Sequence, residues 1–164
     1  MVHKFVNSLK AGKIGESFFL SLLHASAVVY TDVTDDKDYQ KKGIDYLIGN
    51  KSVDIKFDMR SGDTGNIAFE TVSRRKDGVI HKEGWLYTSL ADSFVYVTIF
   101  QASVVFFLFS KQDILNLLPL GKTRVVNNYG YESEIVAVPI SLLEVPSLIC
   151  PIGKEFESNY SVNL

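Results

Sequence analysis

The chain has 164 residues, a length that suits one domain with a substantial hydrophobic core. Apolar residues make up 46% of it and charged residues 22%, a composition that argues against a disordered or fibrous protein. The formal net charge of −2 excludes a general attraction to nucleic acid or anionic membrane, so binding to a polyanion would need a local basic patch or metal ions. Cys150 is the only cysteine, which excludes an internal disulfide and a cysteine-based zinc site and fits a reducing, cytoplasmic setting.

Two stretches were natural candidates for membrane contact, and we expect neither to insert. The N-terminal stretch MVHKFVNSLKAGKIGE has no long apolar core, so we do not expect a signal peptide. Residues 93–109 are apolar, but Gln101 and Ser103 interrupt the run, and β-branched and aromatic residues dominate it. This pattern predicts two buried strands, 93–100 and 103–109, and no membrane partner.

The expected elements, taken in chain order, mix helices with strands. Phe18/Phe19 and Leu22/Leu23 have helical spacing, which predicts a first helix from about residue 12 to 25. The later elements are a polar acidic loop at 31–38, a hairpin within 40–58, a third strand at 67–73, a short helix at 85–91, the two strands named above, a helix at 111–118, and an edge strand at 133–140 that Pro139 ends. This order predicts one α/β domain over residues 1–164, with a mixed sheet, a core at about 12–118 and a C-terminal extension at 119–164.

The hairpin has a register that can be counted. Gly49-Asn50 lies between two apolar-rich runs and predicts a two-residue turn. The expected pairs are then Ile48 with Lys51, Leu47 with Ser52, Tyr46 with Val53, and Asp45 with Asp54. Because strand side chains alternate between faces, one face is expected to carry the apolar set Ile44, Tyr46, Ile48, Val53, Ile55 and Phe57. The other face is expected to carry Asp45, Asp54, Lys56, Leu47 and Ser52.

Asp45 and Asp54 should therefore lie directly opposite each other, roughly 5 Å apart at their Cβ atoms, where like charges destabilise a sheet. A divalent cation would offset this repulsion, because hard carboxylate oxygens suit Mg²⁺ or Mn²⁺. Lys56 projects from the same face and could hold a nucleophilic water or stabilise developing negative charge. The alternative is a solvent-exposed face with scattered charges, since Asp-x-Lys is a common sequence.

These residues resemble the motifs of the PD-(D/E)xK nuclease superfamily, in its Holliday-junction-resolvase-like or restriction/homing-endonuclease-like branch. The matching parts are Gly-Ile-Asp at 43–45 on the first strand and Asp-Ile-Lys at 54–56 on the second. Glu16 in GKIGESFF on the first helix matches as well, and the resemblance covers roughly residues 12–110. It implies a single-domain, restriction-endonuclease-like αβββαβ core with a mixed central sheet flanked by helices.

The resemblance also implies the roles of the site residues. Asp45 and Asp54 would bind Mg²⁺ or Mn²⁺, Lys56 would be the catalytic lysine, and Glu16 would complete the metal site from the helix. Ile44 stands where the motif has proline, and Asp54 is the less common acid at its position, but neither departure removes a ligand.

Further candidates flank this site. Glu70 lies in an apolar strand, where a carboxylate is costly to bury unless it is paired, so it is either a second-metal ligand in the catalytic site or an exposed edge residue. Gln40 and Lys42 in DYQKKG and Arg74 and Arg75 in SRRKDG could contact DNA phosphates. The alternative for both segments is a solvated loop.

The sequence therefore predicts a metal-dependent DNA endonuclease that hydrolyses phosphodiester bonds. We expect a homodimer or higher homo-oligomer, because cutting two strands is easiest with two sites. Two alternatives stay open: a catalytically silent DNA-binding or assembly domain with the same fold, and a nuclease that acts on RNA. Trp85 and Tyr87 are assigned to packing, with base stacking as the alternative.

Overall fold

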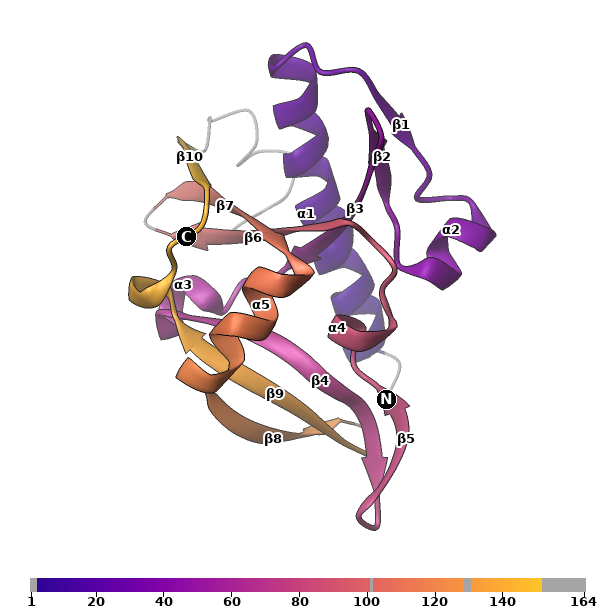
Figure 1. Ribbon diagram of the computed structural model, residues 1–164, viewed down its shortest axis with the longest axis vertical. Coiled ribbons are helices and arrows are strands. Elements are labelled where there is room, and N and C mark those ends of the chain that lie inside the picture. Colours follow the sequence, from indigo (N-terminus) through magenta and orange to yellow (C-terminus); the bar gives the residue numbers. More distant parts are fainter. Residues whose placement is uncertain (1–2, 101, 129–130, 152–164) are drawn as a thin grey trace.

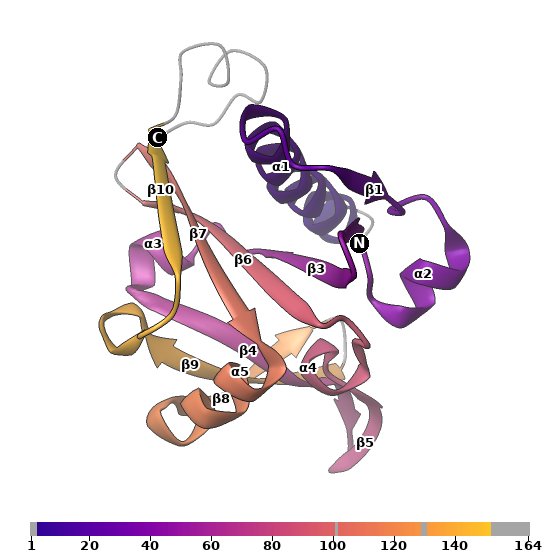
Figure 2. The ribbon, with the colours of Figure 1, turned by 45° about the horizontal axis from the view of Figure 1, so that its top comes forward.

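The computed structural model describes residues 3–100, 102–128 and 131–151, which form two β-sheets and several helices. Helix α1 (His3–Ala25) lies on one face of a six-stranded sheet, and a four-stranded sheet packs on the other (Figures 1 and 2). The protein is thus mixed α/β with more strand than helix. The expected mixed sheet is present, but a long helix covers only one of its faces.

The six-stranded sheet has the order β1-β2-β3-β6-β7-β10. Its strands are β1 (Tyr30–Asp32), β2 (Tyr46–Ile48), β3 (Lys51–Phe57), β6 (Ser93–Phe100), β7 (Ser103–Ser110) and β10 (Ser147–Pro151). All neighbours are antiparallel except β3 and β6, which run parallel. The strands expected at 93–100 and 103–109 are confirmed, and they form the buried centre of this sheet.

The parallel pair needs a crossover, and the chain between β3 and β6 supplies it. The crossover contains α3 (Ser61–Thr64), β4 (Asn66–Lys76), β5 (Val79–Glu83) and α4 (Trp85–Thr88). The helix expected at 111–118 is present as α5 (Lys111–Leu117), which Ser110 and Asp113 begin with a capping box. Two short 3₁₀ helices, η1 (Leu118–Leu120) and η2 (Ile140–Leu142), follow later in the chain.

The second sheet has the order β5-β4-β9-β8, with β8 (Lys122–Asn128) and β9 (Tyr131–Pro139). Two predictions are wrong here: the strand at 67–73 belongs to this sheet and not to that of the hairpin, and the strand at 133–140 is central, not an edge. The cause is packing, because Ile67 and Phe69 of β4 and Val136 and Val138 of β9 alternate inward onto the core between the sheets. The expected C-terminal extension therefore contributes to the core.

Only residues 33–36 of the acidic stretch 31–38 form the expected loop. Its first two residues belong to β1 and its last two begin α2 (Lys37–Lys42). Asp36 caps this helix by accepting hydrogen bonds from the amides of Asp38 and Tyr39, and Gly43 ends it with a left-handed φ of +64°. Asp before a helix and Gly after it are residue types typical of helix caps, so the sequence carries a signal for this helix.

Helix α1 begins at His3, earlier than predicted, and it packs closely on the sheet. Phe18, Phe19 and Leu23 are buried against the hairpin and against β6 and β7. A Cβ atom on Gly15 would lie 2.4 Å from Cβ of Phe57, so only glycine allows this approach. The close packing places Glu16, the next residue, beside the hairpin. Over the described residues, none of the helices is long and apolar enough to span a membrane.

Candidate functional site

The hairpin register is confirmed as far as Tyr46 opposite Val53. Gly49 takes a left-handed φ of +59° in the turn, as the two-residue connection requires. Beyond Tyr46 the expected pairing is wrong, because Asp45 leaves the ladder. Its amide donates to the Val53 carbonyl over 2.9 Å, and its Oδ2 accepts the Ile55 amide over 2.7 Å.

This break in the ladder also moves Ile44. The residue was expected beside Tyr46 on the core face, but it packs with Val33 and Ala91 in a separate small cluster. Leaving the ladder frees the Asp45 carboxylate from the alternation of the strand, so that it reaches across to the backbone of β3.

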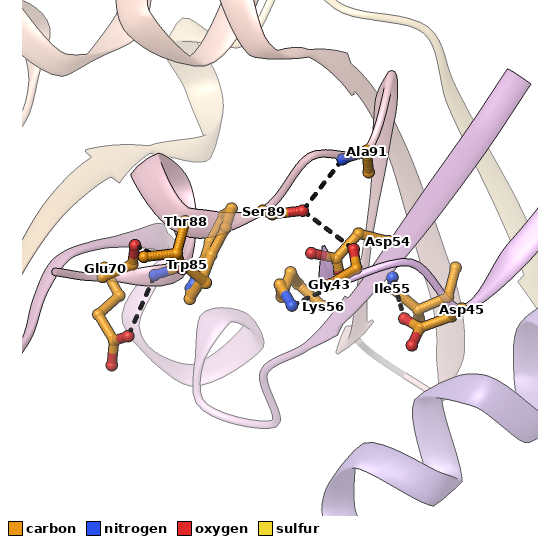
Figure 3. A network of polar contacts seen from close by, with 11 residues as sticks. Gly43, Asp45, Asp54, Ile55, Lys56, Glu70, Trp85, Thr88, Ser89 and Ala91 are labelled. Carbon is orange, nitrogen blue, oxygen red and sulfur yellow. Dashed lines mark hydrogen bonds and ion pairs between the residues drawn. The ribbon is translucent and has the colours of Figure 1, made fainter. Parts of the chain in front are cut away.

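Asp54 and Lys56 form the centre of the candidate site (Figure 3). Asp54 is only 1% exposed, and its Oδ1 lies 2.5 Å from the Lys56 Nζ atom. Within the part of the chain that the structure describes, the buried Oδ2 of Asp54 has no partner in hydrogen-bonding geometry, although the Ser89 hydroxyl lies near enough to lower the pKa of Asp54. The Lys56 ammonium also lies 5.2 Å from the centre of the Trp85 ring, a cation–π arrangement.

The electrostatics of Asp54 follow from its burial. Removal from water raises the pKa of Asp54 to about 6, against the opposing effect of the Lys56 ammonium. The Asp45 carboxylate raises this pKa further, because its negative charge lies nearby. Lys56 therefore offsets the carboxylate charge only in part, and a second positive charge would favour the ionised form of Asp54.

Asp45 also borders an open groove of about 600 Å³, which a second group of carboxylates lines. Glu16 from α1, Asp32 from β1, and Asp35 lie there with Asp45. Burial raises the pKa of Glu16, and the Asp45 carboxylate raises it further. The fold thus brings Glu16 to Asp45, as expected, while Asp32 and Asp35 were missed because the acidic stretch was read as a loop.

The four expected metal ligands, Glu16, Asp45, Asp54 and Glu70, do not meet at one point. Among the described residues, no three His, Cys, Asp or Glu side chains form a group that could hold a metal ion. Asp45 connects the acidic groove with the Asp54–Lys56 pair, because its negative charge raises the pKa of both Glu16 and Asp54.

Glu70 has a different partner from the one expected. It is half-buried on β4, and its Oε1 accepts the Trp85 amide over 3.4 Å. Burial raises its pKa, which this hydrogen bond opposes. Figure 3 shows Glu70 and Trp85 on one side of Lys56 and Asp45 on the other. Glu70 is therefore neither an exposed edge residue nor a neighbour of Asp45, and it accepts the backbone amide of Trp85, whose ring lies over Lys56.

Ser89, which the sequence did not indicate, connects two segments that border the site. Its hydroxyl donates to the Gly43 carbonyl over 3.0 Å and accepts the Ala91 amide over 3.3 Å (Figure 3). These bonds join the segment before β6 to the residues that precede Asp45. The serine had no sequence signal, because its partners are remote in the chain.

The expected DNA-binding residues fall into two places. Gln40 lines the acidic groove and donates to the Thr34 carbonyl over 2.5 Å, and the Lys42 ammonium lies 5.5 Å from the centre of the Tyr39 ring. Arg74 and Arg75 lie on β4 in the second sheet, away from the groove. Both pairs belong to regular elements and not to loops, but Gln40, Lys42 and Arg74 are exposed to solvent, as the alternative held.

No protein-family model, curated protein or solved structure matches this chain. A functional assignment therefore depends on the geometry of the site.

Proposed function

We propose that the protein is a metal-dependent DNA endonuclease that hydrolyses phosphodiester bonds. One observation carries the proposal: the buried Asp54 carboxylate has one oxygen on Lys56 and the other without a partner in hydrogen-bonding geometry among the described residues, with a second carboxylate, Asp45, close by. A buried acceptor left unsatisfied is costly, and a site of this kind calls for a functional explanation.

The order of elements supports a restriction-endonuclease-like αβββαβ core. Helix α1 precedes three antiparallel strands, β1, β2 and β3, and β6 then joins β3 in parallel. The third strand is β1, not the segment 67–73 on which the expectation was based. Asp45 stands just before β2, and Asp54 and Lys56 lie on β3, which agrees with the motif positions in the PD-(D/E)xK superfamily.

The side chains fit a hard divalent cation such as Mg²⁺ or Mn²⁺. Mg²⁺ often binds proteins through only one or two carboxylates and keeps waters or substrate phosphates as its other ligands. Asp45 and the open oxygen of Asp54 would supply those carboxylates, and Glu16 would approach from the groove side of Asp45. The cation would supply Lewis-acid activation of water and neutralise charge on the scissile phosphodiester.

The chain's own residues would prepare the reaction. The Ile55 amide holds Asp45 in place, and burial between the sheets fixes Asp54. Lys56, positioned between Asp54 and the Trp85 ring, has its ammonium group where it would orient the attacking water or stabilise negative charge on the phosphate. Two such sites in a homodimer would cut the two strands of a duplex.

A second candidate is a catalytically silent DNA-binding or assembly domain. It is favoured by the absence, among the described residues, of a three-carboxylate group, and by the ion pair that Lys56 already makes with Asp54. In that case the Asp54–Lys56 pair would be a structural remnant.

The test is cleavage of supercoiled plasmid and of branched DNA with Mg²⁺, Mn²⁺ or EDTA. We expect Asp54→Asn to lower metal-dependent cleavage more than 100-fold while DNA binding in EDTA is retained. The matched control is Asp63→Asn, because Asp63 is an exposed carboxylate on α3. Circular dichroism would confirm that both variants fold.

Three results separate the candidates. Loss of cleavage only in Asp54→Asn supports the nuclease. Equal cleavage by wild type and Asp54→Asn contradicts the mechanism. Binding without cleavage by wild type under every metal condition supports the silent domain.

A further inference from the structure

The outer part of β4 and all of β5 form a hairpin, here called the β4–β5 arm (residues 72–83). Asp77 and Gly78 make its turn with φ values of +50° and +78°. Figure 1 shows this turn at one end of the long axis of the molecule. β5 is the edge strand of its sheet, and all five of its residues are exposed. β9 pairs with β4 as far as Arg75 opposite Glu132, so the arm has a free edge along β5 and is two-stranded only at its tip.

The arm carries four cations, Arg74, Arg75, Lys76 and Lys82, against two anions, Asp77 and Glu83, although the whole chain has a net charge of −2. Arg74 lies directly opposite Lys82 in the β4–β5 register, and Lys76 follows at the tip. Like charges at directly opposed positions destabilise a hairpin by about 0.2–1 kcal/mol. Within the described residues none of these three cations forms an ion pair, although the charge of Lys82 lowers the pKa of Glu70.

Arg75 differs from its neighbour Arg74. Its guanidinium donates to Glu134 over 3.1 Å, and Thr71 donates to the same carboxylate over 2.9 Å. The Cζ atom of Arg74 instead lies 4.5 Å from the centre of the Tyr131 ring. This cation–π contact uses none of the hydrogen-bond donors of Arg74, whereas Arg75 donates to Glu134.

The tip of the arm also exposes apolar side chains. Val79 is 57% exposed and Ile80 is 50% exposed, and the register sets them opposite Lys76 and Arg75. Apolar side chains flanked by cations are typical of elements that enter a DNA groove, where they contact base edges while the cations meet phosphates.

The base of the arm is tied to the candidate site. The Gly84 amide donates to the Thr71 carbonyl over 2.9 Å, and the Trp85 amide donates to Glu70, while the Trp85 ring covers Lys56. Each strand residue advances about 3.3 Å, so the tip lies about 20–25 Å from this base. That distance is less than one turn of B-DNA, about 34 Å, so one duplex can meet both the arm and the site.

We propose that the tip of the β4–β5 arm, which extends beyond β9 as a two-stranded ribbon, enters the major groove of duplex DNA. Arg74, Lys76 and Lys82 contact phosphates, and Val79 and Ile80, which point to opposite faces of β5, contact the groove from the two sides of the tip. The B-DNA major groove, about 12 Å wide, admits a two-stranded ribbon, whereas the major groove of A-form RNA is too deep and narrow. The inference deepens the proposed nuclease function, on which it rests for its substrate, by selecting duplex DNA over duplex RNA.

The experiment measures binding without cleavage, in EDTA, by fluorescence anisotropy with 20-base-pair DNA, the same RNA duplex and single-stranded DNA. The test variant is Arg74→Ala/Lys82→Ala, and the matched control is Lys122→Ala/Arg124→Ala, two exposed cations on β8 at the far edge of the same sheet. We expect the test variant to weaken duplex DNA binding at least 10-fold and to reduce the slope of log K against log salt by about 2. The control should bind like wild type, and both variants should stay folded, with urea midpoints close to that of wild type.

A second variant tests the groove assignment. Val79→Ser/Ile80→Ser removes the apolar tip but keeps every cation. We expect it to weaken duplex DNA binding while the salt slope stays unchanged, because the phosphate contacts remain. An unchanged affinity in this variant would overturn the groove assignment.

Other results would also overturn the proposal. These are wild-type affinity in the Arg74/Lys82 variant, equal losses for duplex DNA and duplex RNA, or a loss of binding to anionic lipid vesicles without a loss for DNA. Failure of the nuclease proposal has another signature: wild type would bind DNA through the arm but cleave nothing. Failure of the arm alone would leave cleavage by the Arg74/Lys82 variant at the wild-type level.

Discussion

Two hairpins of this protein bring like charges together. One buries a charge with a counter-ion, and the other leaves its charges exposed. In the β2–β3 hairpin, Asp45 leaves the ladder, and Asp54 is buried with Lys56 as an internal counter-ion. In the β4–β5 arm, Arg74 and Lys82 stay opposed on an exposed ribbon, with no internal anion among the described residues that pairs with them.

The difference follows from burial. A buried charge without a partner costs several kcal/mol, so a fold must supply a counter-ion or neutralise the group by protonation. An exposed pair of like charges is screened by water and salt and costs far less, so the fold tolerates it. This difference in burial is the physical basis on which we propose a small cation at the first hairpin and a large external polyanion at the second.

The largest effect should be the dependence of stability on pH through Asp54. Its pKa in the folded state is about 6, above the ordinary value of 3.8, so the folded protein holds the proton more tightly. This contribution to stability is present below about pH 4 and is lost as the pH rises to about 6, a change on the order of 3 kcal/mol. Urea unfolding in EDTA should show that Asp54→Asn removes this loss.

The comparison with wild type isolates Asp54, because burial also raises the pKa values of Glu16 and Glu70 and these remain in the variant. Asp63→Asn is again the control. Parallel pH profiles for wild type and Asp54→Asn would show that Asp54 is not the buried acid described here.

The next effect is the loss of the internal counter-ion. In Lys56→Met, Asp54 loses its partner and takes up a proton rather than remaining charged. At pH 7, one unit above the wild-type pKa of about 6, this costs about 1.4 kcal/mol of unfolding free energy, and the cost rises at pH 8. Denaturant titrations at both pH values, with Lys51→Met as an exposed control, measure it. A cost independent of pH would indicate lost packing on Trp85 instead.

Glu70 lies where the two regions join, and its substitution tells whether it acts on metal or on Trp85. Glu70→Gln keeps an oxygen that accepts the Trp85 amide, so we expect cleavage within about 10-fold of wild type. Glu70→Ala should lose about 1 kcal/mol of stability and change the intrinsic fluorescence, since Trp85 is the only tryptophan. If the Gln variant were as inactive as Asp54→Asn, Glu70 would be a metal ligand after all.

The smallest effect should come from the arm. Lys82→Ala relieves the repulsion from Arg74, so the free energy of unfolding should rise by a few tenths of a kcal/mol at low salt. The gain should vanish at high salt, because exposed charges are screened. Thermal unfolding at two ionic strengths, with Lys122→Ala beside it, provides the measurement. A loss of stability would mean that Lys82 has a favourable partner in the folded arm.

Local patterns were enough to predict much of the site. The turn at Gly49-Asn50, with the count outward from it, placed Tyr46 opposite Val53 correctly. Period-two alternation put Val53 and Ile55 in the core and Asp54 and Lys56 on the other face. These features depend on contacts between neighbours in the chain, which leave a direct mark on the residue pattern.

The residue pattern does not show to which of the two sheets a strand belongs. The alternation in β4 is as regular as that in β3, but β4 packs with β9, which follows more than fifty residues later. The three residues of β1 are too few for a periodic signal, although they complete the three antiparallel strands before the crossover.

The hairpin turn, the register next to it and the residue types of the candidate site thus follow from local sequence patterns. The tertiary packing makes Asp45 leave the ladder to accept the Ile55 amide, sets Lys56 between Asp54 and Trp85, and brings Glu16 to Asp45 in the acidic groove. The physical reason is that pairing across a turn is a local event, whereas burial and counter-ions depend on segments that meet only when both sheets and α1 have packed.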